Sequence, residues 1–171
     1  MDIKYKIEFF TYWHCGSGLE AGADVDSLVV KDKDGLPFVP GKTMKGLVRE
    51  AAEDLMYFRE GNRSLLAPFF GNSEDKDNTQ NRTPMTGCGF FSNAGLDGQE
   101  HDAIVAGELG KYMYRAIAST AIDDQGVASP HSLRRMEVAV PCCLSGEILN
   151  VPEELHDTIC DALRMIKRLG Q

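Results

Sequence analysis

The sequence predicts an α+β fold in which helices cover one face of an antiparallel sheet. Apolar and polar residues alternate over residues 3–9, which is typical of a half-buried strand. Apolar residues recur at helical spacing over residues 44–56 and again over residues 155–166. Strand-like segments lie between these two helices. With 171 residues, 43% of them apolar, we expect a single domain over residues 1–171 with its own core.

The charge balance and the cysteines limit the classes of function. The chain has 18 Lys and Arg against 26 Asp and Glu, a net charge of −8, which argues against a nonspecific nucleic-acid binder. Its five cysteines form no C-x-x-C pair, so a zinc ribbon or a thioredoxin-like site is not expected. The sequence shows neither a signal peptide nor an apolar run near the roughly 20 residues of a membrane span. We therefore expect reduced thiols, a cytoplasmic location and no membrane partner.

The first half of the chain predicts a loop, a hairpin and a helix. Residues 15–27 are rich in Gly and Asp and predict a mobile loop. Residues 28–39 carry an Asp-Gly step between two apolar segments, which favours a short hairpin. The helix opens after Pro40, and Thr43 is its expected N-cap.

The second half predicts further strands and a final helix. Mobile loops are expected over residues 72–86 and 95–102, with a strand at 87–91 between them. A pair of strands is expected over residues 135–149. The last helix starts near Pro152, and Gly170 is its expected C-terminal cap.

Two glycine-containing motifs nearly match phosphate-binding loops. Gly16–Ala21 fits G-x-G-x-x-A, but a hairpin follows where a dinucleotide site needs a helix. Gly35–Thr43 resembles a P-loop, but it has one residue too many and two prolines that cannot donate N–H groups. The start of the helix at residues 41–45 is open to two interpretations. It either holds one phosphate group beside two lysines or is a capped helix with solvated lysines.

Four stretches, in this order, resemble the RAMP superfamily of CRISPR-associated proteins, most of all the backbone subunits of type III effector complexes. They cover residues 13–18, 25–49, 70–94 and 121–137. The most specific is Leu36-Pro37-Phe38-Val39-Pro40-Gly41-Lys42-Thr43-Met44-Lys45-Gly46-Leu47-Val48-Arg49. The resemblance implies a ferredoxin-like, RRM-related core with long insertions and a thumb near residues 119–136. Because relatives continue beyond residue 171 into an Arg/Gly-rich loop and a last strand, we expect a core without these elements and, at its unpaired sheet edge, self-association.

The same resemblance implies a role in antiviral defence. Such a subunit binds guide RNA, assembles with other CRISPR effector subunits and cuts target RNA. Asp26 matches the position of the cutting aspartate, which would hold Mg²⁺, and Asp24 lies two residues before it. The residues expected to contact RNA are His14, Lys42, Thr43, Lys45, Arg49, His131, Arg134 and Arg135.

Several alternatives remain open from the sequence. A stand-alone RAMP endoribonuclease would process repeat RNA without metal, with His14 as general base. A noncatalytic scaffold would only assemble with partner proteins. At the level of single residues, His14 is equally well explained by a local hydrogen bond, and the aspartates near residue 26 by a solvated acidic loop.

Overall fold

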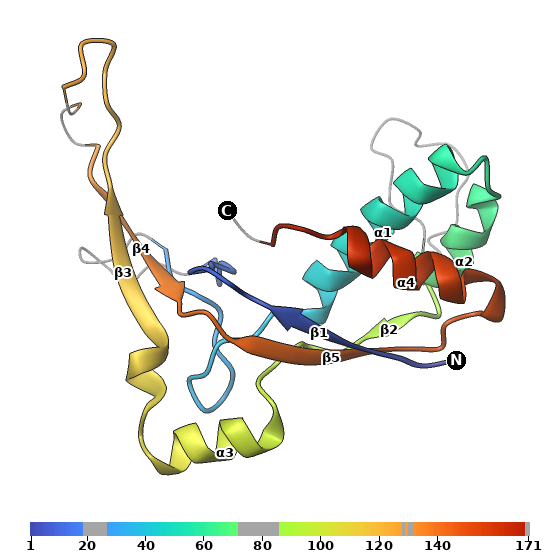
Figure 1. Ribbon diagram of the computed structural model, residues 1–171, viewed down its shortest axis with the longest axis horizontal. Helices are drawn as coiled ribbons and strands as arrows, with labels where there is room; N and C mark the ends of the chain where they lie inside the picture. Colours follow the sequence, from blue (N-terminus) through green and yellow to red (C-terminus); the bar gives the residue numbers. More distant parts are fainter. Residues whose placement is uncertain (19–26, 72–85, 128, 130–131, 170–171) are drawn as a thin grey trace. The chain divides into compact units, whose positions relative to one another are not determined.

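A computed structural model of the chain describes residues 1–18, 27–71, 86–127, 129 and 132–169 (Figure 1). Asp24, Asp26 and His131 lie outside the described residues, as do most of the predicted loops at 15–27 and 72–86. None of the helices within the described ranges is both long and apolar enough to cross a membrane.

The chain forms two compact units. The first contains Met1–Tyr5, Pro40–Ala94 and Gly146–Arg168. The second contains Lys6–Val39 and Gly95–Ser145. The strands β1 (Ile3–Glu8) and β5 (Cys143–Leu149) have residues in both units.

The first unit is built on a three-stranded sheet with the strand order β1-β5-β2, where β2 is Phe90–Phe91. Strand β2 runs antiparallel to β5, and Phe91 lies opposite Ile148. The predicted strand at residues 3–9 is confirmed as β1, in which exposed residues alternate with buried or half-buried ones. The first residue, Met1, exchanges two backbone hydrogen bonds with Val151, of 2.7 and 2.8 Å, just beyond the end of β5.

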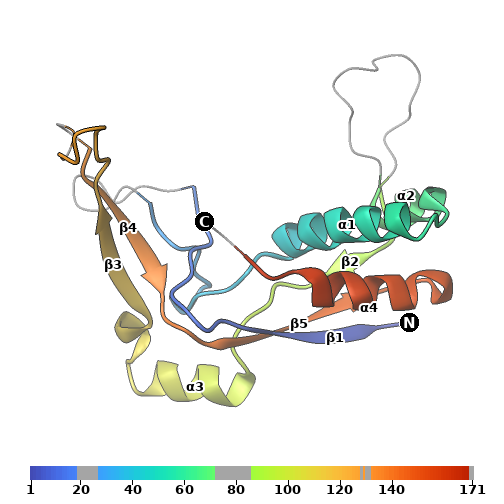
Figure 2. The ribbon, with the colours of Figure 1, turned by 45° about the horizontal axis from the view of Figure 1, so that its top comes forward.

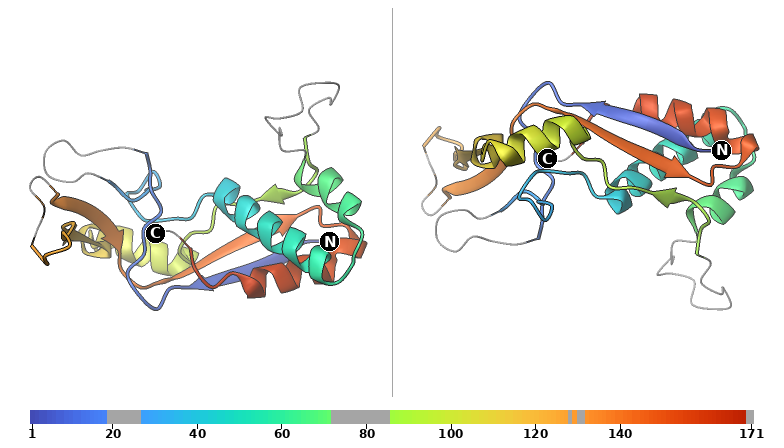
Figure 3. Two further views of the ribbon diagram at one scale, coloured as in Figure 1. Left: turned by 90° about the horizontal axis from the view of Figure 1, so that it is seen from above. Right: turned by 90° about the horizontal axis from the view of Figure 1, so that it is seen from below.

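Two helices, α1 (Gly41–Phe58) and α4 (His156–Met165), pack against each other on one face of this sheet (Figures 2 and 3). The short η1 (Arg63–Leu65), α2 (Leu66–Phe70) and η3 (Glu153–Leu155) complete the unit. The buried faces of α1, η3 and α4 consist of Met44, Val48, Ala52, Leu55, Met56, Leu155, Ile159 and Ala162. The predicted fold class, helices combined with antiparallel strands, is therefore confirmed. The last helix is shorter than predicted, because the backbone is already extended at Ile166.

The start of α1 differs from the prediction. Thr43 is not the N-cap, because the helix already begins at Gly41 and Pro40 occupies the cap position. The side chain of Asn93, which follows β2, accepts a hydrogen bond of 2.9 Å from the Gly41 N–H. A residue from another segment thus takes the capping role that the local sequence suggested for Thr43.

Position 41 requires a glycine, because the start of α1 lies very close to the backbone of Phe91 and Ser92. A Cβ atom at position 41 would overlap the carbonyl oxygen of Phe91 and lie 2.9 Å from that of Ser92. The glycine in the Pro-Gly-Lys-Thr motif is therefore explained by packing of the helix start against backbone.

The second unit contains a two-stranded antiparallel ribbon of β3 (Tyr114–Ser119) and β4 (Arg134–Ala139). The predicted pair of strands over residues 135–149 is wrong in its pairing, because β4 pairs with β3 and β5 belongs to the other sheet. Pro141, which has no N–H to donate, lies in the break between β4 and β5. The segment predicted as a thumb forms the end of this ribbon, where Asp123 accepts hydrogen bonds from the backbone of Gln125 and Val127.

Two helical segments precede β3, namely α3 (Gly98–Ala106) and η2 (Gly110–Met113). The predicted loop at 95–102 is therefore wrong from Gly98 onwards. Asp97 caps α3 by accepting a hydrogen bond from the Gln99 N–H. No residue of α3 is fully buried, so no apolar period marked this helix in the sequence.

We predict that Gly41→Ala lowers the free energy of unfolding by about 2 kcal/mol, because the new methyl group must displace backbone at Phe91. Gly46→Ala on the same helix is the matched control. Nothing lies within 4 Å of a Cβ at position 46, so we expect a gain of up to about 1 kcal/mol from helix propensity. Urea unfolding of both variants measures the difference. If both substitutions changed the free energy of unfolding equally, this would contradict the close approach of Gly41 to the backbone of Phe91.

Candidate nucleic-acid interface

In the second unit, Glu137 connects β4 to the segment that begins at Ser27. Its backbone N–H donates a 3.0 Å hydrogen bond to the carbonyl oxygen of Ser27. Its carboxylate accepts hydrogen bonds from the Val29 N–H, at 3.1 Å, and from Lys31 Nζ, at 2.9 Å. Only 16% of the Glu137 side chain is exposed. Three hydrogen bonds to one residue, Glu137, therefore hold the segment from Ser27 to Lys31.

His14 lies beside this connection and is buried, with 7% of the residue exposed. Its Nδ1 is 2.7 Å from the carbonyl oxygen of Glu137, which can only accept, so Nδ1 donates. In this tautomer Nε2 accepts from the hydroxyl of Ser27 at 3.1 Å. Gly16 leaves room for the ring, because a Cβ there would lie 3.2 Å from Nε2. Both ring nitrogens of His14 are thus used in hydrogen bonds within the chain.

Lys31 continues the network from Glu137 to the hairpin. Its ammonium lies 4.1 Å from the ring centroid of Tyr114, a cation–π contact. The Tyr114 hydroxyl donates a 2.7 Å hydrogen bond to the carbonyl oxygen of Gly35. Burial raises the pKa of Tyr114 above its ordinary value, and the carboxylates of Glu137 and Asp32 raise it further. The hydroxyl therefore stays a donor throughout the neutral pH range.

The predicted contacts on α1 belong to the first unit. Lys42 is exposed and Lys45 half-buried, and neither is in an ion pair with any residue that the structure describes. Thr43 is half-buried near the start of the helix. Arg49 lies four residues after Lys45 and so on the same helix face. Its side chain binds Glu53 at 2.8 Å and the carbonyl oxygen of Gly71 at 3.3 Å, which connects α1 to the end of α2.

The predicted contacts on β4 are exposed. Arg134 lies opposite Ser119, and Arg135 lies opposite Ala118. Consecutive residues of a strand point to opposite faces, so the two arginines cannot contact one phosphate side by side. The structure brings His14 close to Ser27 and Glu137, whereas the four α1 residues belong to the other unit.

Sequence reasoning did not identify Glu137 as the residue that organises this region. A signal was present, because a carboxylate stands between Met136 and Val138 in a strand that ends in the core. A charge at such a position is usually paired. The pattern could not show that its partners are Val29 and Lys31, more than a hundred residues earlier.

Comparisons with known proteins agree with this architecture. The family model of the RAMP superfamily matches residues 6–170, so the chain belongs to the RAMP superfamily. No curated protein sequence matches the chain significantly.

Two solved cryo-EM structures of the type III-B complex Cmr-beta contain similar chains. A chain from the complex bound to cognate target RNA is 12% identical, with a TM-score of 0.67 over 99% of this chain and 90% of that chain. A chain from the apo state is 13% identical, with a TM-score of 0.65 over 97% of this chain and 90% of that chain. At this identity the likeness establishes the fold.

We predict that Glu137→Ala lowers the free energy of unfolding by about 2 kcal/mol, because it leaves the buried Val29 N–H without an acceptor. Glu53→Ala is the matched control, since it removes an exposed carboxylate from an ion pair with Arg49 and is expected to cost less than about 0.5 kcal/mol. Urea unfolding monitored by circular dichroism compares the two variants. A loss at Glu137 no larger than at Glu53 would mean that the connection does not stabilise the fold.

Proposed function

We propose that this chain is a guide-RNA-binding backbone subunit of a type III CRISPR effector complex and that it cleaves target RNA. The observation that carries the proposal is the likeness, over 99% of the chain, to a subunit of a type III-B complex bound to cognate target RNA. Membership in the RAMP superfamily supports the same class of function. The net charge of −8 does not oppose RNA binding, because Lys42 and Lys45 on α1 form no ion pair with any described residue.

The sheet order supports a ferredoxin-like, RRM-related core. In the element order β1-α1-β2-β5-α4, both long helices lie on one face and β5 is between β1 and β2. Strand β1 is an edge of this three-stranded sheet, and an edge strand offers backbone N–H and C=O groups to another chain. We propose that copies of the chain, or other effector subunits, assemble side by side along a guide RNA.

Guide RNA would be held through its phosphates. Lys42 and Lys45 lie in the first turns of α1, where the positive end of the helix adds to their charge. Arg49 would have to exchange its contacts with Glu53 and Gly71 for a phosphate. Arg134 and Arg135, on opposite faces of β4, would each reach a different part of the RNA.

Target cleavage would use Asp26, with Asp24 as a second carboxylate. Carboxylate oxygens are the donors that Mg²⁺ prefers, so the two residue types fit this ion. When bound, the ion supplies positive charge beside the scissile phosphate. The ribose 2′-hydroxyl would attack the adjacent phosphorus, forming a cyclic phosphate while the bond to the 5′-oxygen breaks. Ser27, the residue directly after Asp26, is held in place by the backbone N–H of Glu137.

The arrangement around His14 favours this mechanism over metal-free cleavage. A general base needs a free lone pair directed at the substrate. In the structure the Nε2 lone pair of His14 accepts a hydrogen bond from Ser27, and the ring is buried. His14 as base would require Ser27 to move away first.

We predict that Asp26→Ala abolishes cleavage of guide-paired target RNA in the assembled complex, while guide binding stays within about twofold, since a single carboxylate adds little to phosphate binding. Electrophoresis of labelled target RNA, with and without EDTA, measures the cleavage. Asp54→Ala, which removes an exposed carboxylate from α1, is the control and should cut normally. Undiminished cleavage by the Asp26 variant would remove Asp26 from the site, and cleavage unaffected by EDTA would exclude the metal.

We predict that Lys45→Ala lowers the salt dependence of guide-RNA binding by about 0.7 in the slope of log K against log salt concentration, the value for one phosphate of a single strand. Fluorescence anisotropy at several salt concentrations gives the slope. Lys167→Ala is the control, because Lys167 is exposed beyond the end of α4 and is not expected to contact RNA. The same loss of slope in both variants would indicate a general charge effect and no contact at Lys45.

A further inference from the structure

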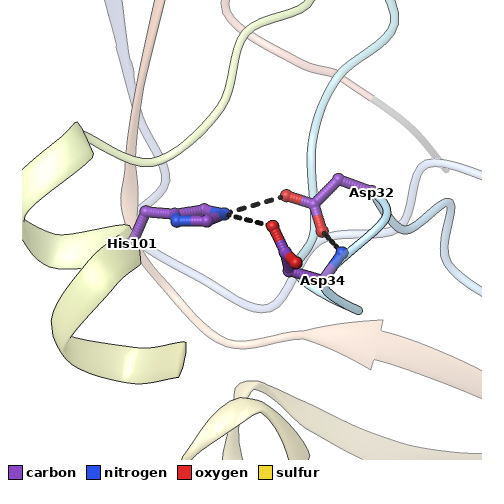
Figure 4. A group of neighbouring side chains, drawn as sticks. All are labelled: Asp32, Asp34 and His101. Atoms are coloured by element: carbon purple, nitrogen blue, oxygen red, sulfur yellow. Dashed lines mark hydrogen bonds and ion pairs between the residues drawn. The ribbon is translucent and has the colours of Figure 1, made fainter. Parts of the chain in front are cut away.

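Three potential metal-ligand side chains from two distant segments meet in the second unit. Asp32 and Asp34 lie in the turn of the hairpin, and His101 lies on α3, in the segment that the sequence predicted as a loop (Figure 4). One ligand atom from each of the three side chains lies within 4.8 Å of the others. None of the three residues is part of the proposed RNA contacts or of the proposed cleavage site.

The imidazole of His101 is directed at both carboxylates. Its Nε2 is 3.5 Å from Oδ2 of Asp32 and 3.3 Å from Oδ2 of Asp34. The other oxygen of Asp32 accepts hydrogen bonds of 2.9 Å from the N–H groups of Asp34 and Leu36. These bonds hold the Asp32 carboxylate in place and leave its Oδ2 facing the imidazole.

A third carboxylate lies on the far side of the ring. Oδ1 of Asp102 is 3.3 Å from Nδ1 of His101. When a metal ion takes the place of a proton at Nε2, the Asp102 carboxylate holds the remaining ring proton at Nδ1, so the lone pair of Nε2 is left for the ion. Histidines that bind metals have this arrangement, in which an outer carboxylate orients the ring and makes the ligand nitrogen more basic.

The negative charge of the group is poorly neutralised by other side chains. Among the described residues, Asp32 has no ion pair with a lysine or an arginine. Asp34 has only Lys33, at 3.8 Å, and the Lys33 side chain is 89% exposed. A neutral imidazole lone pair facing two carboxylates is unfavourable unless a proton or a metal cation lies between them. The side chains of Asp32, Asp34 and His101 retain 26 to 30% exposure, so a cation can reach them from solvent.

We propose that Asp32, Asp34 and His101 bind a divalent transition-metal ion. One nitrogen and two oxygen ligands suit Mn²⁺, Co²⁺ or Zn²⁺, whereas Mg²⁺ rarely accepts imidazole. Three protein ligands leave further coordination positions for water. The ion would clamp the hairpin turn to α3, and it would stabilise the folded chain because the unfolded chain does not hold the three ligands together.

Metal titration of the purified full-length chain tests the proposal. After dialysis against EDTA and then against metal-free buffer, isothermal titration with Zn²⁺ and with Mn²⁺ should show one site per chain for at least one of these ions. Thermal unfolding should shift upwards with the same ion and not with Mg²⁺ at equal concentration. His101→Ala and Asp34→Asn should each weaken the affinity about 10-fold or more, and Asp102→Asn should weaken it about 10-fold through loss of ring orientation.

His156→Ala is the matched control. His156 also stands at the start of a helix with an aspartate next to it, and its Nδ1 is 3.2 Å from Asp157. Its Nε2, however, faces the sulfur of Cys160 at 4.0 Å, with no pair of carboxylates there. This variant should keep the affinity of the unmodified chain. Absence of a transition-metal site, or an affinity unchanged in both His101→Ala and Asp34→Asn when circular dichroism shows them folded, would overturn the proposal.

Discussion

The second unit depends on the interaction of Glu137 with the segment from Ser27 to Lys31. A half-buried carboxylate is costly unless it is hydrogen-bonded, and here one oxygen takes a backbone N–H while the other takes an ammonium. The same residue donates its N–H to Ser27 and offers its carbonyl oxygen to His14. The side chain, the backbone N–H and the backbone C=O of one residue therefore align three stretches of chain.

This interaction extends to the hairpin through Lys31. The ammonium that pairs with Glu137 also contacts the ring of Tyr114, whose hydroxyl holds the carbonyl group of Gly35. The turn that contains Asp32 is thereby held against the start of β3. In the first unit the comparable constraint is at the start of α1, where Gly41 lies against the backbone after β2 and Asn93 caps the helix. That contact sets where Lys42 and Lys45 emerge.

The parts of the fold that were predicted correctly are those with strong local patterns. Alternation identified β1, the Asp-Gly step identified the hairpin turn, and the apolar stripe identified α1. The helix α3 was missed because it buries no residue completely and so shows no period. The pairing of β4 with β3 was also missed, since β3 is exposed over most of its length and looks irregular in sequence. The surroundings of the predicted site residues were not visible in the sequence.

The sequence by itself determined the RAMP-like order of motifs, the α+β class and the position of the main helices, because burial periodicity and turn residues are local properties. Only the tertiary structure decided that His14 is hydrogen-bonded at both ring nitrogens, that Asn93 and not Thr43 caps α1, and that Asp32, Asp34 and His101 meet. Each of these contacts joins residues brought together by the path of the folded chain. Such contacts arise from long-range packing, which no periodicity within a single segment encodes.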